Sequence, residues 1–316
     1  MTEWQVAHRS ALDHVVTLIA GSEWAETVVL RGSMAMPAWV GDAARPPGDL
    51  DLILLPSPIV GVDTREPWPF VPHLGPSQHW PEAVHGGARN EIWTFEEFET
   101  GGLRPVLPPE GLHWMTSLDV SEPFDFAHQF LIDLLTGHPR TPDGVLLDLD
   151  AATENLSWDY SEPDEYTTTS ENGRARLRIP WTTPAGLPGH MQIDLSYDEP
   201  LPTPPVLTAV PRVAAPPIAV LTAGRELSLA WKLHWLAADQ QSEGRSAAKD
   251  LYDAVLLAEL PQIRLRPRLQ RLALPQPLSP TALAGWTIDG PLPGGPAPWL
   301  TRLATALPHL TAAPAP

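Results

Sequence analysis

Two aspartates separated by one residue, Asp49 and Asp51, offer the clearest chemistry in this chain. The run Asp49-Leu50-Asp51-Leu52 continues as apolar residues up to Leu55, which predicts a β-strand. Side chains at positions i and i+2 of a strand share a face, so the two carboxylates would converge. Converging carboxylates repel unless a cation lies between them, and Mg²⁺ is commonly held by one or two carboxylates together with substrate phosphates. The pair predicts a Mg²⁺ site, with a solvent-facing pair on an edge strand as the alternative.

Upstream, Gly32 and Ser33 lie between a short β-branched run, 27–30, and a short predicted helix, 34–40. A glycine lets the backbone approach a phosphate closely, and amides at a helix N-terminus favour negative charge. The hydroxyl of Ser33 can donate to the same phosphate. This turn is therefore expected to bind phosphate groups next to the Asp49 and Asp51 pair.

A third carboxylate, Asp194, lies inside a second strand-like run, 190–197. Aspartate between Ile193 and Leu195 is a poor choice for a strand side that faces a core. Three carboxylates around paired metal ions would let one ion activate an attacking hydroxyl and the other stabilise a leaving pyrophosphate. The alternative is that Asp194 faces solvent on the outer side of its strand.

Two amphipathic helices are predicted further along, at 226–238 and 246–260. Lys232 lies between apolar residues of the first, and its spacing alone favours a side chain that reaches the surface. Asp250 and Asp253 are three residues apart and share a face of the second helix. Like charges at that spacing require a positive group or a bound ion nearby.

The elements that must position these residues form an α/β pattern with a mixed sheet. A helix is predicted at 4–20 and another at 124–135, and a strand at 174–179. The Pro-rich stretch 200–217 is the best boundary, so we predict a core at 1–205 and a helical C-terminal domain at 206–316. The Pro- and Trp-rich segment 56–114 gives little periodic signal, and the tail 307–316 is expected to be mobile.

Composition excludes several kinds of function. The 316 residues contain no cysteine, which excludes disulfides, thiol catalysis and cysteine-ligated zinc. No apolar run of about 18 residues and no signal peptide are present, which predicts a cytoplasmic protein without a membrane partner. No Walker-type, Rossmann or Gly-x-Ser-x-Gly pattern occurs. His8 and His14 show no metal-ligand spacing and are expected to be surface groups.

The net charge of −18 is unevenly distributed. Residues 1–200 hold 10 Lys and Arg against 31 Asp and Glu, whereas residues 201–316 hold 10 against 7. Four arginines of the second part fall inside eight residues, at Arg264, Arg266, Arg268 and Arg271. An anionic macromolecule is therefore expected to contact the C-terminal part. The alternative is that the acidic composition only keeps the protein in solution.

The run Val28 to Met36, with Arg45 and Asp49-Leu50-Asp51-Leu52, resembles the AbiEii/AbiGii-type nucleotidyltransferase toxins of type IV toxin–antitoxin systems, including MenT-like members. The runs 190–196, 226–238 and 245–253 resemble a later strand and two later helices of that family. The resemblance implies a DNA-polymerase-β-like nucleotidyltransferase core, α/β (α+β) with a mixed sheet, and a helical C-terminal domain. Arg31 departs from the family, where many relatives have glycine.

The resemblance also implies an enzyme that moves NMP from an NTP to an RNA acceptor, the tRNA 3′ end, with Mg²⁺. A cognate antitoxin protein would be a partner, in toxin–antitoxin or phage-defence systems, and DNA would not. The implied catalytic residues are Asp49, Asp51, Lys232 and Asp250. Nucleotide binding falls to Gly32, Ser33 and Lys232, and metal binding to Asp49, Asp51 and Asp194. Alternatives are a protein hydroxyl or a small molecule such as an aminoglycoside as acceptor, or a non-catalytic NTP-binding module.

Overall fold

The structure is a computed structural model that describes residues 2–55, 70–71, 104–105, 129–160, 171–197, 201–273 and 280–311. The chain divides into two compact units, one formed by 1–55 with 128–316 and the other by 56–127. In the second unit the description is limited to an antiparallel pair, β3 (Phe70–Val71) with β4 (Arg104–Pro105). The rest of the Pro- and Trp-rich segment 56–114 lies outside the described residues.

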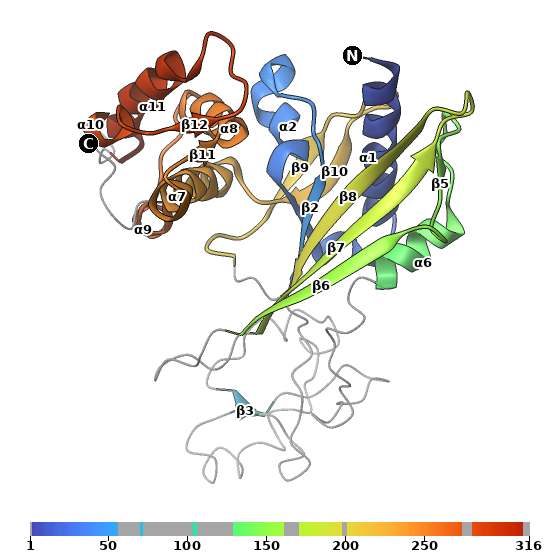
Figure 1. Cartoon of the computed structure of the whole chain (residues 1–316). Helices are drawn as coiled ribbons and strands as arrows, with labels where there is room; N and C mark the ends of the chain where they lie inside the picture. The colour runs from blue at the N-terminus through green and yellow to red at the C-terminus, as the bar shows by residue number, and fades with distance from the viewer. Residues whose placement is uncertain are drawn as a thin grey trace. The chain divides into compact units, whose positions relative to one another are not determined.

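A mixed sheet forms the centre of the first unit (Figure 1). Its described strands follow the order β5-β7-β8-β2-β1-β10-β9, and β6 also pairs with β7. The pairs β1/β10 and β2/β8 are parallel, and the others are antiparallel. The strands are β1 (Val28–Arg31), β2 (Leu50–Leu54), β5 (Leu146–Leu147), β6 (Thr153–Tyr160), β7 (Glu171–Thr182), β8 (Pro188–Tyr197), β9 (Val206–Val210) and β10 (Ile218–Thr222).

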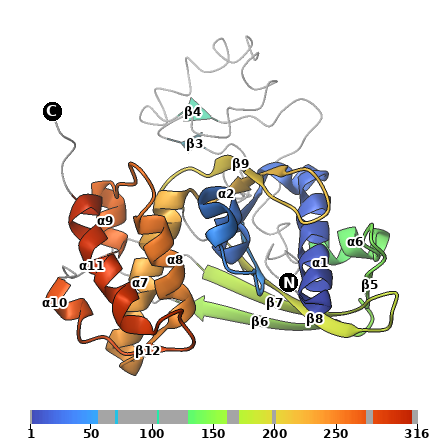
Figure 2. The same ribbon diagram turned by 90° about the horizontal axis from the view of Figure 1, so that it is seen from above.

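Helices lie on both sides of this sheet, which confirms the predicted mixed α/β class with C-terminal helices (Figure 1). The helices are α1 (Glu3–Ala20), α2 (Met36–Val40), α6 (Gln129–Gly137), α7 (Arg225–Glu243), α8 (Ala248–Ala258), α9 (Pro267–Ala273), α10 (Pro280–Leu283) and α11 (Pro296–Thr311). Short 3₁₀ turns occupy Glu23–Glu26, Gly32–Met34 and Gly41–Ala43. Helix α1 begins with a Thr2–Gln5 capping box and ends at Gly21. Both views place α2 between α8 and α1 (Figure 2).

The C-terminal helices share one apolar core with one face of the sheet. Leu229 and Leu233 of α7 and Leu251 of α8 are fully buried in this core, together with Val29 of β1 and Ile53 of β2. Because side chains alternate along a strand, every residue two positions from Val29 or Ile53 faces the same helices. A short parallel pair, β11 (Ser246–Ala247) with β12 (Ile288–Asp289), joins the start of α8 to the segment before α11.

Two features bear on the predicted organisation. Strands β9 and β10 continue the sheet after residue 205, and the helices begin at Arg225, so the division into 1–205 and 206–316 stays a proposal. The tail expected to be mobile is helical as far as Thr311, where α11 ends. Leu307 and Leu310 are buried in the helical core, and this burial holds the segment in place although Pro308 lies within the helix.

Candidate active site

Four charged residues lie directly opposite one another across neighbouring strands of the sheet. Arg31 of β1 is opposite Asp51 of β2, and Asp51 is opposite Asp194 of β8. Asp194 is in turn opposite Arg176 of β7. Arg31 and Asp51 are each two positions from Val29 and Ile53, so this row faces the C-terminal helices. The sheet thereby places two carboxylates between two guanidinium groups.

Asp49, just before β2, completes a cluster of three carboxylates with Asp51 and Asp194. One carboxylate oxygen from each lies within 4.8 Å of the others, and all three residues are half-buried. Burial and then the neighbouring charge of Asp49 raise the pKa of Asp51 to about 6. Carboxylate oxygens at this separation fit a divalent cation.

Positive and amide groups surround the carboxylates. Arg176 donates to both oxygens of Asp194, at 2.6 Å from Nε and 3.2 Å from Nη2. Gln192 donates to Asp194 as well, at 2.9 Å. Arg31 donates to the hydroxyl of Ser196 at 3.0 Å, and its guanidinium lies 5.3 Å from the centre of the Trp231 ring. Asp194 thus points into the site rather than to solvent on the outer side of its strand.

The turn after β1 brings Gly32 and Ser33 against the carboxylates. Gly32 has a φ of +73°, and a Cβ atom at this position would overlap the carboxylate of Asp51. Ser33 is buried, and its hydroxyl donates to Asp49 over 3.4 Å. The turn therefore shapes the carboxylate cluster directly.

A buried ionic network on α7 and α8 faces the same site. Lys232 is 6% exposed and donates to Asp250 over 2.6 Å, and its Nζ lies 3.3 Å from Asp253. Arg45, from the loop before β2, forms a fork of hydrogen bonds of 3.0 to 3.2 Å with Asp253. The charge of Lys232 also lowers the pKa of Asp51, against the larger effects of burial and Asp49. The network therefore joins the loop before the first carboxylates to both helices.

Residues 130–276 match a family model described as Nucleotidyl transferase AbiEii toxin, Type IV TA system. Residues 130–276 of this chain are thus similar to the AbiEii nucleotidyltransferase toxins. The resemblance seen in the sequence motifs is thus confirmed, and the reaction class is nucleotidyl transfer. No protein with a curated description matches the chain at a significant level. None of the described helices combines the length and the apolar character that crossing a membrane requires.

The matched region supplies only part of the carboxylate cluster. Asp194, Lys232 and Asp250 lie within 130–276, whereas Asp49 and Asp51 precede it. The parallel pairing of β2 with β8 brings the two parts together, with Asp51 opposite Asp194. The strand and the two helices that carry the later residues are therefore built from the region that matches the family.

Three expectations about single residues need correction. The spacing around Lys232 favoured a surface position, but it is buried because the α7 face that carries it packs on α8. His8 and His14 were expected at the surface, yet they are 4% and 9% exposed. His8 Nε2 lies 3.2 Å from the Gly48 carbonyl, beside Asp49, and His14 Nε2 lies 2.8 Å from the His138 carbonyl. Burial lowers the pKa of His8.

Sequence reasoning missed Arg176, which holds Asp194, and the Arg45–Asp253 contact. A signal for Arg176 was present: arginines alternate with apolar residues from Arg174 to Ile179, so one face of that strand is basic. Nothing local pairs Arg45 with Asp253, since 208 residues separate them.

Gly32→Ala is expected to damage this protein more than an ordinary glycine substitution. A positive φ costs an alanine about 1–2 kcal/mol, and the added Cβ also displaces Asp51. Displacing a reacting group by about 1 Å costs on the order of 100-fold in rate. Gly244→Ala is the matched control, because its φ is +71° and nothing lies within 4 Å of its Cβ position. Urea unfolding and rate assays on both variants test this; equal losses in the two variants would contradict it.

Proposed function

We propose that this protein is a Mg²⁺-dependent nucleotidyltransferase that moves NMP from an NTP to an RNA acceptor, the 3′ end of tRNA. In this role it acts in the cytoplasm as the toxin of a toxin–antitoxin or phage-defence system, neutralised by a cognate antitoxin protein. The observation that carries the proposal is the cluster of Asp49, Asp51 and Asp194 in a domain matched to AbiEii nucleotidyltransferases.

The three carboxylates would hold Mg²⁺, which supplies charge neutralisation for the triphosphate and favours ionisation of the acceptor hydroxyl. The raised pKa of Asp51 supports this assignment, because a cation relieves the repulsion among the carboxylates. In the transfer, the acceptor oxygen forms a bond to the α-phosphorus, and the bond from that phosphorus to the pyrophosphate oxygen breaks. An in-line displacement of this kind depends on positioning and electrostatic stabilisation.

The chain's positive groups would orient the triphosphate. Arg31 is opposite Asp51 on the neighbouring strand, and the charges of Arg31 and Lys232 both lower the pKa of Asp51, which supports a role for both with phosphates bound at the cluster. Asp250 holds the ammonium of Lys232 at 2.6 Å and so fixes its position. Gly32 leaves space beside Asp51 that a side chain would fill.

Incubation with each of four α-³²P-labelled NTPs, Mg²⁺ and total tRNA tests the proposal. Label is expected on tRNA with at least one NTP and is expected to vanish with EDTA. Periodate oxidation of the tRNA 3′ terminus beforehand should abolish labelling if the 3′ hydroxyl is the acceptor. If label appears on a protein band or on an aminoglycoside and not on RNA, that molecule is the acceptor and the RNA assignment is wrong. Nucleotide binding without transfer to any of these would leave only a binding module.

A further inference from the structure

Strand β7 presents three arginines on the sheet face that carries the carboxylates. Arg174, Arg176 and Arg178 are exposed, whereas Ala175 and Leu177 between them are buried. Alternate residues of a strand lie about 6.6 Å apart on one face. That repeat is of the same order as the spacing of consecutive phosphates in an extended polynucleotide. The three arginines, here called the β7 stripe, therefore form a regular row of positive charge.

The middle of the β7 stripe lies in the row of the carboxylate cluster. Arg176 is opposite Asp194, which is opposite Asp51, so the stripe runs two strands away from Asp51, roughly 10 Å. Arg174 and Arg178 extend the stripe to either side of that row. Anything bound along the β7 stripe therefore passes next to the carboxylates.

The neighbours of the stripe on both adjoining strands are mostly neutral. On β8, Arg174 is opposite Ser196 and Arg178 is opposite Gln192. On the β6 side, the exposed residues opposite Arg176 and Arg178 are Asn155 and Thr153. Glu154 is opposite Leu177 and so belongs to the other face.

The three guanidinium groups differ in what they already contact. Arg176 is held by Asp194, and Arg178 lies 3.1 Å from the ring nitrogen of His190. Within the described part of the chain, Arg174 has no side-chain partner. Three of the ten basic residues in an acidic region of 200 residues thus gather beside the carboxylates, where an anionic ligand would balance their charge.

From this placement we propose that the β7 stripe binds the phosphate backbone of single-stranded RNA leading to the acceptor end. The inference rests on the proposed transfer to RNA and assigns the surface that the RNA uses. Guanidinium groups bind phosphate through paired hydrogen bonds, and their planar shape suits successive phosphates. Arg176 keeps Asp194 in place, while Arg174 and Arg178 contact the strand on either side.

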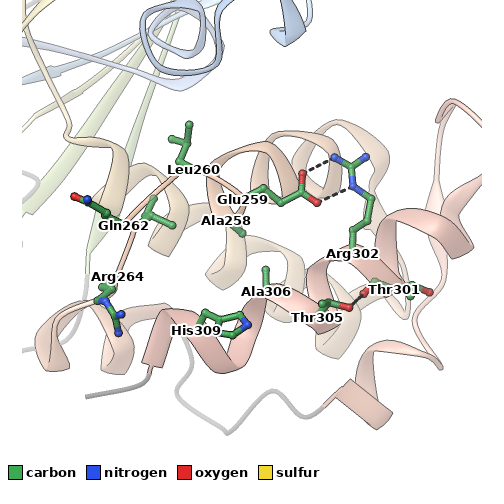
Figure 3. A pocket seen from close by; sticks show the side chains of 11 residues that line it. Ala258, Glu259, Leu260, Gln262, Arg264, Thr301, Arg302, Thr305, Ala306 and His309 are labelled. Carbon is green, nitrogen blue, oxygen red and sulfur yellow. Dashed lines mark hydrogen bonds and ion pairs between the residues drawn. The ribbon is translucent and has the colours of Figure 1, made fainter. Parts of the chain in front are cut away.

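This assignment differs from the expectation that charge balance alone suggested, namely the arginines at 264–271. Figure 3 shows Arg264 and Arg302 at a pocket between the end of α8 and α11, where Arg302 is bound to Glu259 at 2.6 and 2.8 Å. These arginines belong to the helical core region and not to the carboxylate face of the sheet. They provide the control surface for the test.

The test compares Arg174→Gln/Arg178→Gln with Arg266→Gln/Arg268→Gln. The second variant removes two exposed arginines that lie outside the carboxylate face of the sheet. Binding of a fluorescein-labelled single-stranded RNA is measured by anisotropy from 50 to 300 mM salt, and NTP binding by calorimetry. The β7 variant is expected to bind RNA about 10-fold more weakly at low salt. The slope of log K against log salt should fall by about 1.4, two contacts at about 0.7 each. NTP affinity and Tm should stay unchanged.

The RNA-binding and label-transfer measurements together either support or overturn the β7 stripe as the RNA surface. Equal RNA affinity in the two double variants, or a larger loss in the control, would overturn the β7 stripe as the RNA surface, and so would absence of RNA binding by the wild type. Weaker RNA binding by the β7 variant without any label transfer by the wild type would keep the surface and reject the proposed reaction. A raised KM for RNA with unchanged KM for NTP, in protein that transfers label, would support both.

Discussion

Asp51→Asn is expected to lower nucleotidyl transfer by about 1000-fold while raising the stability of the metal-free protein. Bound metal contributes several kcal/mol of transition-state stabilisation, and each 1.4 kcal/mol is about a factor of ten. The stability gain follows from removing one of three facing carboxylates, because burial and then the neighbouring charge of Asp49 raise the pKa of Asp51 to about 6. From that shift we expect about 1–3 kcal/mol at neutral pH.

The raised pKa of Asp51 determines how the stability difference between Asp51→Asn and wild type changes with pH. A folded-state pKa above the unfolded value means that the folded protein binds the proton of Asp51 more tightly. That stabilisation is fully present below pH about 4 and is lost as the pH rises through about 6. The stability of Asp51→Asn relative to wild type should therefore increase between pH 4 and 6 and stay constant above.

Thermal unfolding in EDTA across this pH range, and again with Mg²⁺, measures the effect. Mg²⁺ should stabilise the wild type by mass action and Asp51→Asn much less. Asp289→Asn is the control, since it removes the same charge from an exposed position. A variant that is less stable than wild type in EDTA at pH 7, or that keeps its response to Mg²⁺, would remove the metal assignment from Asp51.

Lys232→Met is expected to destabilise the protein by about 3–5 kcal/mol, because it leaves a buried carboxylate without its partner. Asp250 is 7% exposed and is paired with Lys232 at 2.6 Å. Asp253 keeps its hydrogen bonds with Arg45, so Asp250 is the carboxylate that loses its positive partner. The midpoint of urea unfolding measures this loss.

The double variant Lys232→Met/Asp250→Asn separates a structural role from a role in transfer. Neutralising Asp250 should recover most of the lost stability, because no unpaired buried charge remains. Transfer should stay at the level of the single variant if the ammonium serves the triphosphate. Recovery of transfer together with stability would make the Lys232–Asp250 pair a structural contact only. A single variant as stable as wild type would contradict the buried-pair argument itself.

The features that the sequence predicted well depend on local rules. Asp49 and Asp51 converge because positions i and i+2 of a strand share a face, and the seven apolar or aspartate residues from Asp49 to Leu55 make that strand recognisable. The helix at α1, the turn at Gly32 and the helices α7 and α8 likewise follow from periodicity and glycine positions. The alternation that exposes Arg174, Arg176 and Arg178 is of the same kind.

Only the tertiary structure decided which side chains from distant parts of the chain contact one another. Asp194 joins Asp51 through the parallel pairing of β2 with β8, across more than a hundred residues, and sequence spacing carries no information on that register. Lys232 is buried because α7 packs on α8, and Arg45 reaches Asp253 over 208 residues. The row of arginines on β7 follows from the alternation and pairing of that strand, because electrostatic contact depends on which side chains share a face and not on their totals. The sequence by itself therefore determined the strands, helices and carboxylates of this protein, and long-range packing assembled them into one site.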